Sequence, residues 1–212
     1  FGIIITFLLQ SSSATTVMLV SFVDTGMMNV AQTMGVILGS DIGTTLTVQL
    51  ISFRLHHYAV GIVGLGLLIM FLSRQETRRA LGQGIFGFGL IFLSIGLITE
   101  AMSPLKDNKL LLDILLTLGK NPILTVILSA LLTSLIQASA ATIGLAISLS
   151  LNHLITLDTA IPIVLGANIG TATTAVLASL RSKTEARQVA SGHIFFKIAG
   201  VLIFLPFLGH LS

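Results

Sequence analysis

The sequence predicts an all-α, polytopic membrane protein that contains two inverted-topology repeats. The chain is 54% hydrophobic and only 9% charged, with a mean hydropathy of +1.02, whereas a soluble domain carries about 25% charged residues. Several apolar runs approach the ~20 residues that a helix needs to cross a bilayer. Two polar motifs recur at a fixed spacing, which indicates an internal duplication.

The distribution of charge favours a membrane protein over a nucleic-acid binder. The net charge is +3, but the basic residues lie in short gaps between apolar runs, without a basic stripe. Cysteine is absent from the sequence, which excludes thiol chemistry. The sequence shows no nucleophile–base pair and no cluster of metal ligands, so we do not expect an enzyme. We expect a multi-pass protein of the cell membrane with lipid as a partner, and a homo-oligomer is compatible with the sequence.

The first polar island, Gln10–Thr16, divides the apolar run of residues 1–23. Each half has about ten residues, which is too short to cross a bilayer core of ~30 Å. We therefore expect a re-entrant helical hairpin, ended by the turn Asp24-Thr25-Gly26. Because Phe1 already lies inside an apolar run, we expect the natural protein to begin earlier.

A second apolar run covers residues 30–53 and is interrupted by the block 39–45, Gly-Ser-Asp-Ile-Gly-Thr-Thr. Glycines beside a carboxylate within such a run predict a broken helix, which is tolerated only inside protein or against a cavity. Residues 54–57 (Arg-Leu-His-His) mark a loop. Residues 58–72 and the glycine-rich segment 80–102 are then expected to be spans.

The second half begins with a different kind of segment. Residues 105–118 alternate charged residues with leucines, which predicts an amphipathic helix at the membrane interface. Pro122 is well placed to start the next helix. Residues 122–151 are apolar on both sides of a second island, Gln137–Thr142, so a second re-entrant hairpin is expected.

The remaining run contains a second glycine block. Residues 157–180 are interrupted at 166–171, Gly-Ala-Asn-Ile-Gly-Thr, which again predicts a broken helix, and residues 189–211 form a last span. His193 and Lys197 lie on one face of that span. The favoured interpretation is packing, with Lys197 extending toward the inner surface. The alternative is a counter-charge to a substrate.

A shift of 127 positions places Gln10 on Gln137 and both glycine blocks in register without a gap. Sixteen of the 49 positions from Thr6 to Arg54 are then identical. Chance matching of apolar residues does not keep two polar motifs in register. Counting spans with most basic loop residues inside makes the two copies inverted. The predicted division is a first repeat over 1–79 (N-terminally incomplete), a connecting part over 80–119 and a second repeat over 120–212.

The paired islands have the chemistry of an anion site. The N-terminus of a half-helix presents free N–H groups and partial positive charge. Serine, threonine and glutamine side chains can donate hydrogen bonds to an oxyanion, and their oxygens suit a hard cation such as sodium. Neither island contains Arg or Lys. Helix dipoles and co-bound cations would therefore have to balance the charge of an anion.

The two Gln-Ser-Ser-Ser-type islands, each followed by Gly-x-(Asp/Asn)-Ile-Gly-Thr, resemble the sodium-dependent phosphate cotransporter family, the type II Na/Pi cotransporters and their bacterial relatives. The resemblance extends to about residue 207. It implies a shared substrate site lined by both islands, sodium as the coupling ion and no organic cofactor. The implied phosphate-binding residues are Gln10, Ser11, Ser12, Ser13, Thr15, Gln137, Ser139 and Thr142. The implied sodium ligands are Asp41, Thr44, Thr45, Asn168, Thr171 and Thr174.

The second island departs from the family pattern, because Ala138 and Ala140 stand where the pattern has serine. The resulting prediction is a symporter that couples sodium entry to uptake of inorganic phosphate by alternating access. Two alternatives remain open. One is a transporter of another oxyanion, such as sulfate or arsenate. The other is a membrane subunit that senses phosphate without moving it.

Overall fold

A computed structural model describes residues 1–51, 55–102, 104 and 107–210. Every regular element in these ranges is a helix, so the predicted all-α class is confirmed. Four helical stretches among the described residues are long and apolar enough to cross a membrane: Leu55–Leu72, Glu76–Met102, Leu157–Ser179 and Thr184–Leu208.

The first island separates two helices, α1 (Gly2–Leu9) and α2 (Ser12–Asp24). This confirms the two-helix shape expected of residues 1–23. A buried hydrogen bond of 3.0 Å between Thr6 Oγ1 and Thr15 Oγ1 joins the helices. The expected turn follows, with Gly26 in the left-handed region at φ 78°.

The break expected within residues 39–45 is wrong, because α3 runs without interruption from Val30 to Ile51. The glycines serve helix packing instead. A Cβ on Gly43 would lie 2.8 Å from the carbonyl oxygen of Ile3, and one on Gly39 would lie 3.1 Å from the nitrogen of Ile3. A glycine costs a helix only about 1 kcal/mol, and close approach of α1 favours the continuous α3.

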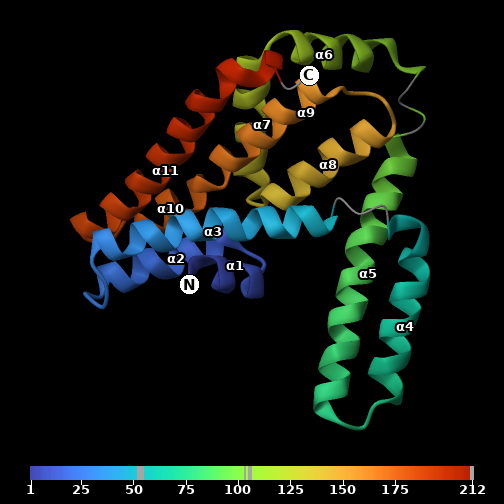
Figure 1. Cartoon of the computed structure of the whole chain (residues 1–212), viewed down its shortest axis with the longest axis horizontal. Coiled ribbons are helices and arrows are strands. Elements are labelled where there is room, and N and C mark those ends of the chain that lie inside the picture. Colours follow the sequence, from blue (N-terminus) through green and yellow to red (C-terminus); the bar gives the residue numbers. More distant parts are fainter. Residues whose placement is uncertain (52–54, 103, 105–106, 211–212) are drawn as a thin grey trace.

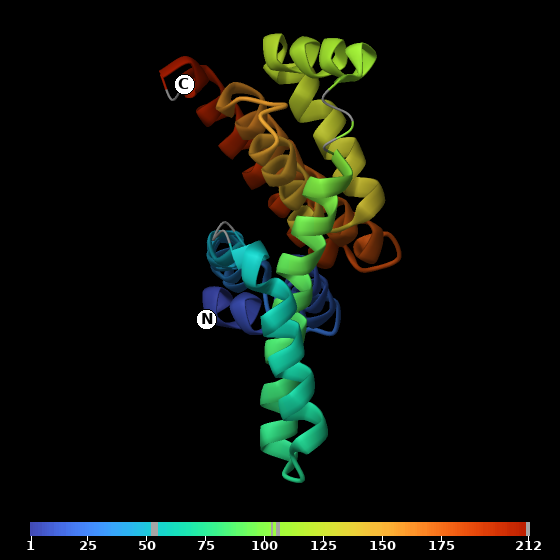
Figure 2. The same cartoon turned by 90° about the vertical axis from the view of Figure 1, so that its right-hand side faces the viewer.

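Helices α4 (Ala59–Leu72) and α5 (Glu76–Met102) form a long antiparallel pair that extends away from the other helices (Figures 1 and 2). Both expected spans are confirmed, the second starting four residues early. A 3-10 turn, η1 (Leu55–Tyr58), contains His56 and His57 of the expected loop. Arg54 lies outside the described residues.

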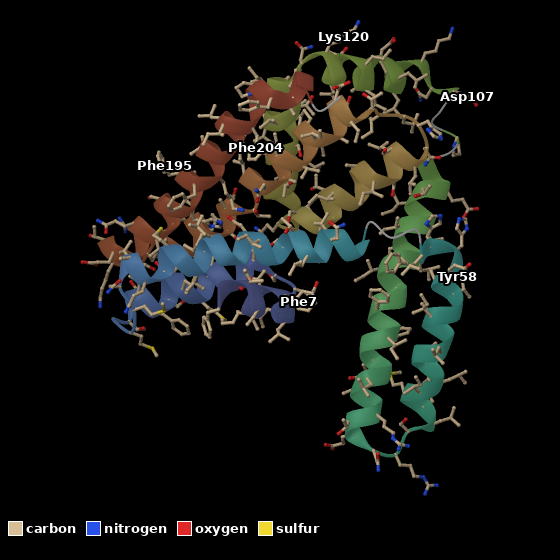
Figure 3. The ribbon with its side chains drawn as sticks, in the orientation of Figure 1. Phe7, Tyr58, Asp107, Lys120, Phe195 and Phe204 are labelled. Atoms are coloured by element: carbon tan, nitrogen blue, oxygen red, sulfur yellow. The ribbon has the colours of Figure 1, made fainter. Side chains whose placement is uncertain are left out.

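The expected amphipathic helix is α6 (Lys109–Lys120), while residues 105 and 106 lie outside the described part of the chain. It is bent by 113° from α7 (Pro122–Ile136), whose first residue is the predicted Pro122. Figure 3 shows Asp107 and Lys120 at the two ends of α6, at the edge of the molecule. This placement agrees with an interfacial helix.

The second hairpin consists of α7 and α8 (Ser139–Leu151), joined by a hydrogen bond of 2.8 Å between Thr133 Oγ1 and Thr142 Oγ1. Next come α9 (Leu157–Gly170) and α10 (Ala172–Ser179). The helix interruption expected here amounts to Thr171 alone, which keeps helical angles (φ −66°, ψ −22°). The predicted break is therefore confirmed at Thr171, within the block 166–171, although the backbone does not unwind there.

The glycines of the second block again lie against a hairpin helix. A Cβ on Gly166 would lie 2.3 Å from the carbonyl oxygen of Val126, and one on Gly170 would lie 2.5 Å from that of Ala130. Both glycine blocks thus allow the first helix of a hairpin to approach the long helix that follows it.

The last span is α11 (Thr184–Phe204), followed by the 3-10 helix η3 (Leu205–His210). It starts five residues before the expected 189. Helix α11 packs against α2, α3, α9 and α10, so it joins the two halves of the chain. Part of this junction is an apolar cluster of Val20, Ile37 and Val189.

The 127-residue register predicted from the sequence recurs in the helix boundaries. Helices α2 and α8 start and end at equivalent residues, and α3 and α9 start at equivalent residues. The two threonine pairs are also equivalent. The inverted orientation of the copies and the division at residues 79 and 119 stay predictions.

Candidate functional site

Each hairpin reverses direction at a glutamine in the left-handed region. Gln10 has φ 54° and Gln137 has φ 60°, and each is followed by an extended residue, Ser11 or Ala138. This conformation costs a residue with a side chain about 1 kcal/mol, and such positions concentrate at functional sites. The result is that α2 and α8 each begin directly at an island.

The two islands meet at one cavity of about 100 Å³. The N-terminal residues of α2 and α8 line it together with residues of α3 and the start of α10. None of the lining side chains is charged. They are Thr6, Gln10, Ser11, Ser12, Ser13, Thr44, Val48, Gln137, Ala138, Ser139, Ala140 and Thr171. The structure therefore brings together the two islands that the repeat paired in sequence.

Most of the predicted phosphate-binding residues lie at this cavity. Those that line it are Gln10, Ser11, Ser12, Ser13, Gln137 and Ser139. Thr15 and Thr142 do not, because they face the hairpin interior, where they bond to Thr6 and Thr133. The repeat matched Thr6 to Thr133, but no sequence pattern predicted that Thr6 lies at the cavity.

The predicted sodium ligands separate into three groups. Thr44 and Thr171 line the cavity. Thr45 is exposed and its hydroxyl donates to the carbonyl oxygen of Ile42, while that of Thr174 donates to the carbonyl oxygen of Thr171. Asp41 and Asn168 form the third group, which contacts a buried lysine.

The two islands differ in how they cap their helices. Ser11 is the N-cap of α2, and its Oγ accepts a hydrogen bond of 3.1 Å from the N–H of Ala14. Ala138 is the N-cap of α8 and cannot form that bond. A helix leaves its first N–H groups without internal partners. The α8 terminus therefore offers the cavity more free backbone donors.

Lys197 holds Asp41 and Asn168 together. Its Nζ donates to Asp41 Oδ1 at 2.8 Å and to Asn168 Oδ1 at 2.5 Å, and only 4% of Lys197 is exposed. The expectation that Lys197 extends toward the inner surface is therefore wrong, because the ammonium group is held in the interior by the half-buried carboxylate of Asp41. His193, expected to pack, is 1% exposed, with Nε2 3.8 Å from Asp41 Oδ1.

This charged network lies one helical turn from the cavity. Thr44 follows Asp41 by three residues on α3, and Thr171 follows Asn168 by three residues at the end of α9, a rise of about 4.5 Å. The Thr171 hydroxyl also donates to the carbonyl oxygen of Asn168 at 2.8 Å. The same two helices thus supply the cavity with threonines and the lysine with oxygen ligands.

The sequence matches the Na+/Pi-cotransporter family over residues 1–100 and 95–209. The chain belongs to this family. It is 33% identical over 207 residues to the protein YqeW of Bacillus subtilis, covering 98% of this chain and 67% of that protein. No solved structure matches the chain.

Two other relatives carry functional names. The putative inorganic phosphate export protein YjbB of Escherichia coli is 33% identical, over 97% of this chain and 38% of that protein. The human sodium-dependent phosphate transport protein 2B is 36% identical over 92 residues, 41% of this chain and 13% of that protein. The chain thus spans two thirds or less of these relatives. Family membership and the apolar helices identify a multi-pass protein of the cell membrane, and a family of transporters agrees with the expectation that the chain is not an enzyme.

Proposed function

We propose that this protein transports inorganic phosphate coupled to sodium, by alternating access of its two repeats around the cavity between the islands. One observation carries the proposal: the N-termini of α2 and α8 border the same small polar cavity. Two such termini add their partial positive charges at one place, which favours an anion. The cavity of about 100 Å³ suits a small inorganic ion.

The lining residues support a tetrahedral oxyanion as the ligand. Ser13 and Ser139 can donate hydroxyl hydrogens, and Gln137 can donate its amide N–H groups. Gln10 Nε2 donates one hydrogen to the carbonyl oxygen of Phe7 and can donate the other to a ligand. Backbone N–H groups contribute mainly from α8, whose N-cap is Ala138. Ser11 already accepts a bond from Ala14, which orients its hydroxyl hydrogen away from its own helix.

Sodium ions are needed in this proposal to balance the negative charge of phosphate. No lining side chain is cationic, so helix dipoles alone would face the full charge of phosphate. Co-bound sodium ions would neutralise it, and their binding would then depend on phosphate. Thr44 and Thr171 are the best placed of the predicted sodium ligands because their side chains line the cavity.

The direction of transport has two candidates. An inward sodium gradient would drive phosphate uptake through such a site. Export is the second candidate, supported by the name of the Escherichia coli relative, which is 33% identical over 97% of this chain. The same site serves both directions, so the gradients decide the net flux.

Flux measurements on the full-length protein in proteoliposomes test the proposal. We expect radiolabelled phosphate to move in response to a sodium gradient and not to an equal potassium gradient, with both uptake and efflux measured. Sulfate and arsenate compete weakly if phosphate is the preferred substrate. Phosphate binding without flux would contradict transport and favour a phosphate sensor. Phosphate flux that does not depend on sodium would contradict sodium coupling.

The same assay tests the islands. Gln10→Ala and Gln137→Ala should each reduce phosphate flux at least tenfold while the thermal unfolding temperature stays unchanged, because both side chains are exposed and border the cavity. Gln75→Ala, at the exposed tip between α4 and α5, is the matched control. Normal flux in both island variants would show that the glutamines only shape the turns.

A further inference from the structure

The ammonium group of Lys197 lies between two equivalent oxygen ligands. Asp41 and Asn168 correspond under the 127-residue shift, one in each repeat. Their Oδ1 atoms converge on Lys197 Nζ, at 2.8 Å and 2.5 Å. A carboxylate oxygen and an amide oxygen held in this way form a site for a monovalent cation, and the protein supplies that cation itself.

The ammonium group of this ion pair lies in the protein interior, unlike that of a surface ion pair. Lys197 is 4% exposed and His193, one turn earlier on α11, is 1% exposed. A buried ammonium without a counter-charge is strongly unfavourable. Among the described residues, Asp41 is the carboxylate that contacts Lys197, and His193 is the other ionisable side chain near that carboxylate.

The lysine belongs to the second repeat and has no lysine counterpart in the first. The residue equivalent to Lys197 in the first repeat is Met70 on α4, and α4 packs with α5 and η1. One lysine therefore serves a pair of ligands that comes from both repeats. A sodium ion placed between the same oxygens would meet the positive charge of the ammonium at short range.

We propose that Lys197 is a tethered cation that occupies the site formed by Asp41 and Asn168 and excludes sodium from it. The proposal deepens the proposed function and rests on it, since it assigns coupling sodium to other ligands such as Thr44 and Thr171. Lys197 is then a specificity-determining residue: removing its ammonium group opens a further sodium site.

Thermal unfolding of the purified full-length protein, in sodium chloride against choline chloride at equal ionic strength, tests this. An ion that binds only the folded state raises its unfolding temperature. Sodium should stabilise Lys197→Gln by about 3 °C or more beyond its effect on the wild type. Lys183→Gln, which removes an exposed lysine, should respond to sodium as the wild type does.

A double variant shows whether the gain depends on the proposed ligand. Asp41→Asn with Lys197→Gln keeps the network uncharged and should lose the additional sodium effect. Equal stabilisation of the wild type and Lys197→Gln, or a gain that persists without Asp41, overturns the proposal. A Lys197→Gln protein that folds only in sodium supports it, and one that unfolds in both salts while the double variant folds overturns it.

This readout does not need phosphate transport. If sodium drives no phosphate flux in the wild type but stabilises Lys197→Gln through Asp41, the proposed function fails and the tethered cation stands. If flux is sodium-coupled, Lys197→Gln should also show a steeper dependence of flux on sodium concentration than the wild type.

Discussion

The hairpin breaks at Gln10 and Gln137 have the same backbone conformation but different side chains. Both have a glutamine in the left-handed region, and each hairpin is closed by a threonine–threonine hydrogen bond. Three serines follow Gln10, but only Ser139 remains between the alanines that follow Gln137. The backbone shape therefore does not depend on the serines. Ser11 Oγ caps α2, and all three serines line the cavity, where their hydroxyl hydrogens can be donated to a ligand.

The surroundings of the two breaks also differ. Gly166 and Gly170 allow closer contact with α7 than Gly39 and Gly43 allow with α1. Thr15 has a second bond, to the carbonyl oxygen of Ser11, whereas Thr142 relies on Thr133. The second hairpin thus depends more on packing and on one bond. This difference leads to three predictions.

The largest effect is expected at the glycines. Gly166→Ala should lower the free energy of unfolding by about 3 kcal/mol. Its Cβ would lie 2.3 Å from the carbonyl oxygen of Val126, so the backbone of one helix would have to move. Gly39→Ala should cost about 1 kcal/mol, since its nearest contact is 3.1 Å. Unfolding in detergent measures both, and Gly61→Ala, with open space around it, is the control. Equal losses at Gly39 and Gly166 would refute the difference in packing.

A smaller difference is expected at the threonine pairs. Thr133→Val leaves the buried Thr142 hydroxyl without a partner among the described residues, which should cost about 2 kcal/mol. Thr6→Val should cost about 1 kcal/mol, because Thr15 keeps its bond to Ser11. The same unfolding measurement compares them. A larger loss for Thr6→Val would reverse the comparison.

The smallest effect concerns the caps. Ser11→Ala should destabilise the protein by about 1 kcal/mol because α2 loses its N-cap. Ala138→Ser should stabilise it by about 0.5 kcal/mol by capping α8, and should weaken phosphate binding, since a backbone donor is then used internally. Unfolding and phosphate binding measured on the same samples check this. Tighter binding by Ala138→Ser would show that the hydroxyl contacts phosphate directly.

Local pattern and repetition predicted much of the fold. Hydropathy and length located the helices and both hairpins. An apolar run that a polar island divides into halves of about ten residues cannot cross a bilayer with either half, whatever packs around it. The gapless repeat also paired the islands, and the structure places Gln10 and Gln137 at one cavity. Thr15 and Thr142 were misplaced because rotation about a helix axis decides which hydroxyls face the cavity.

The sequence by itself determined the membrane class, the hairpin breaks at Gln10 and Gln137 and the pairing of the two islands, because these follow from composition, length and register. Tertiary structure alone decided the role of the glycine blocks, since a helix tolerates glycine at about 1 kcal/mol and the approach of α1 and α7 selects packing over unwinding. It also decided the place of Lys197, which meets Asp41 across 156 residues of chain. No local pattern encodes that contact, because it exists only where α11 packs against α3 and α9.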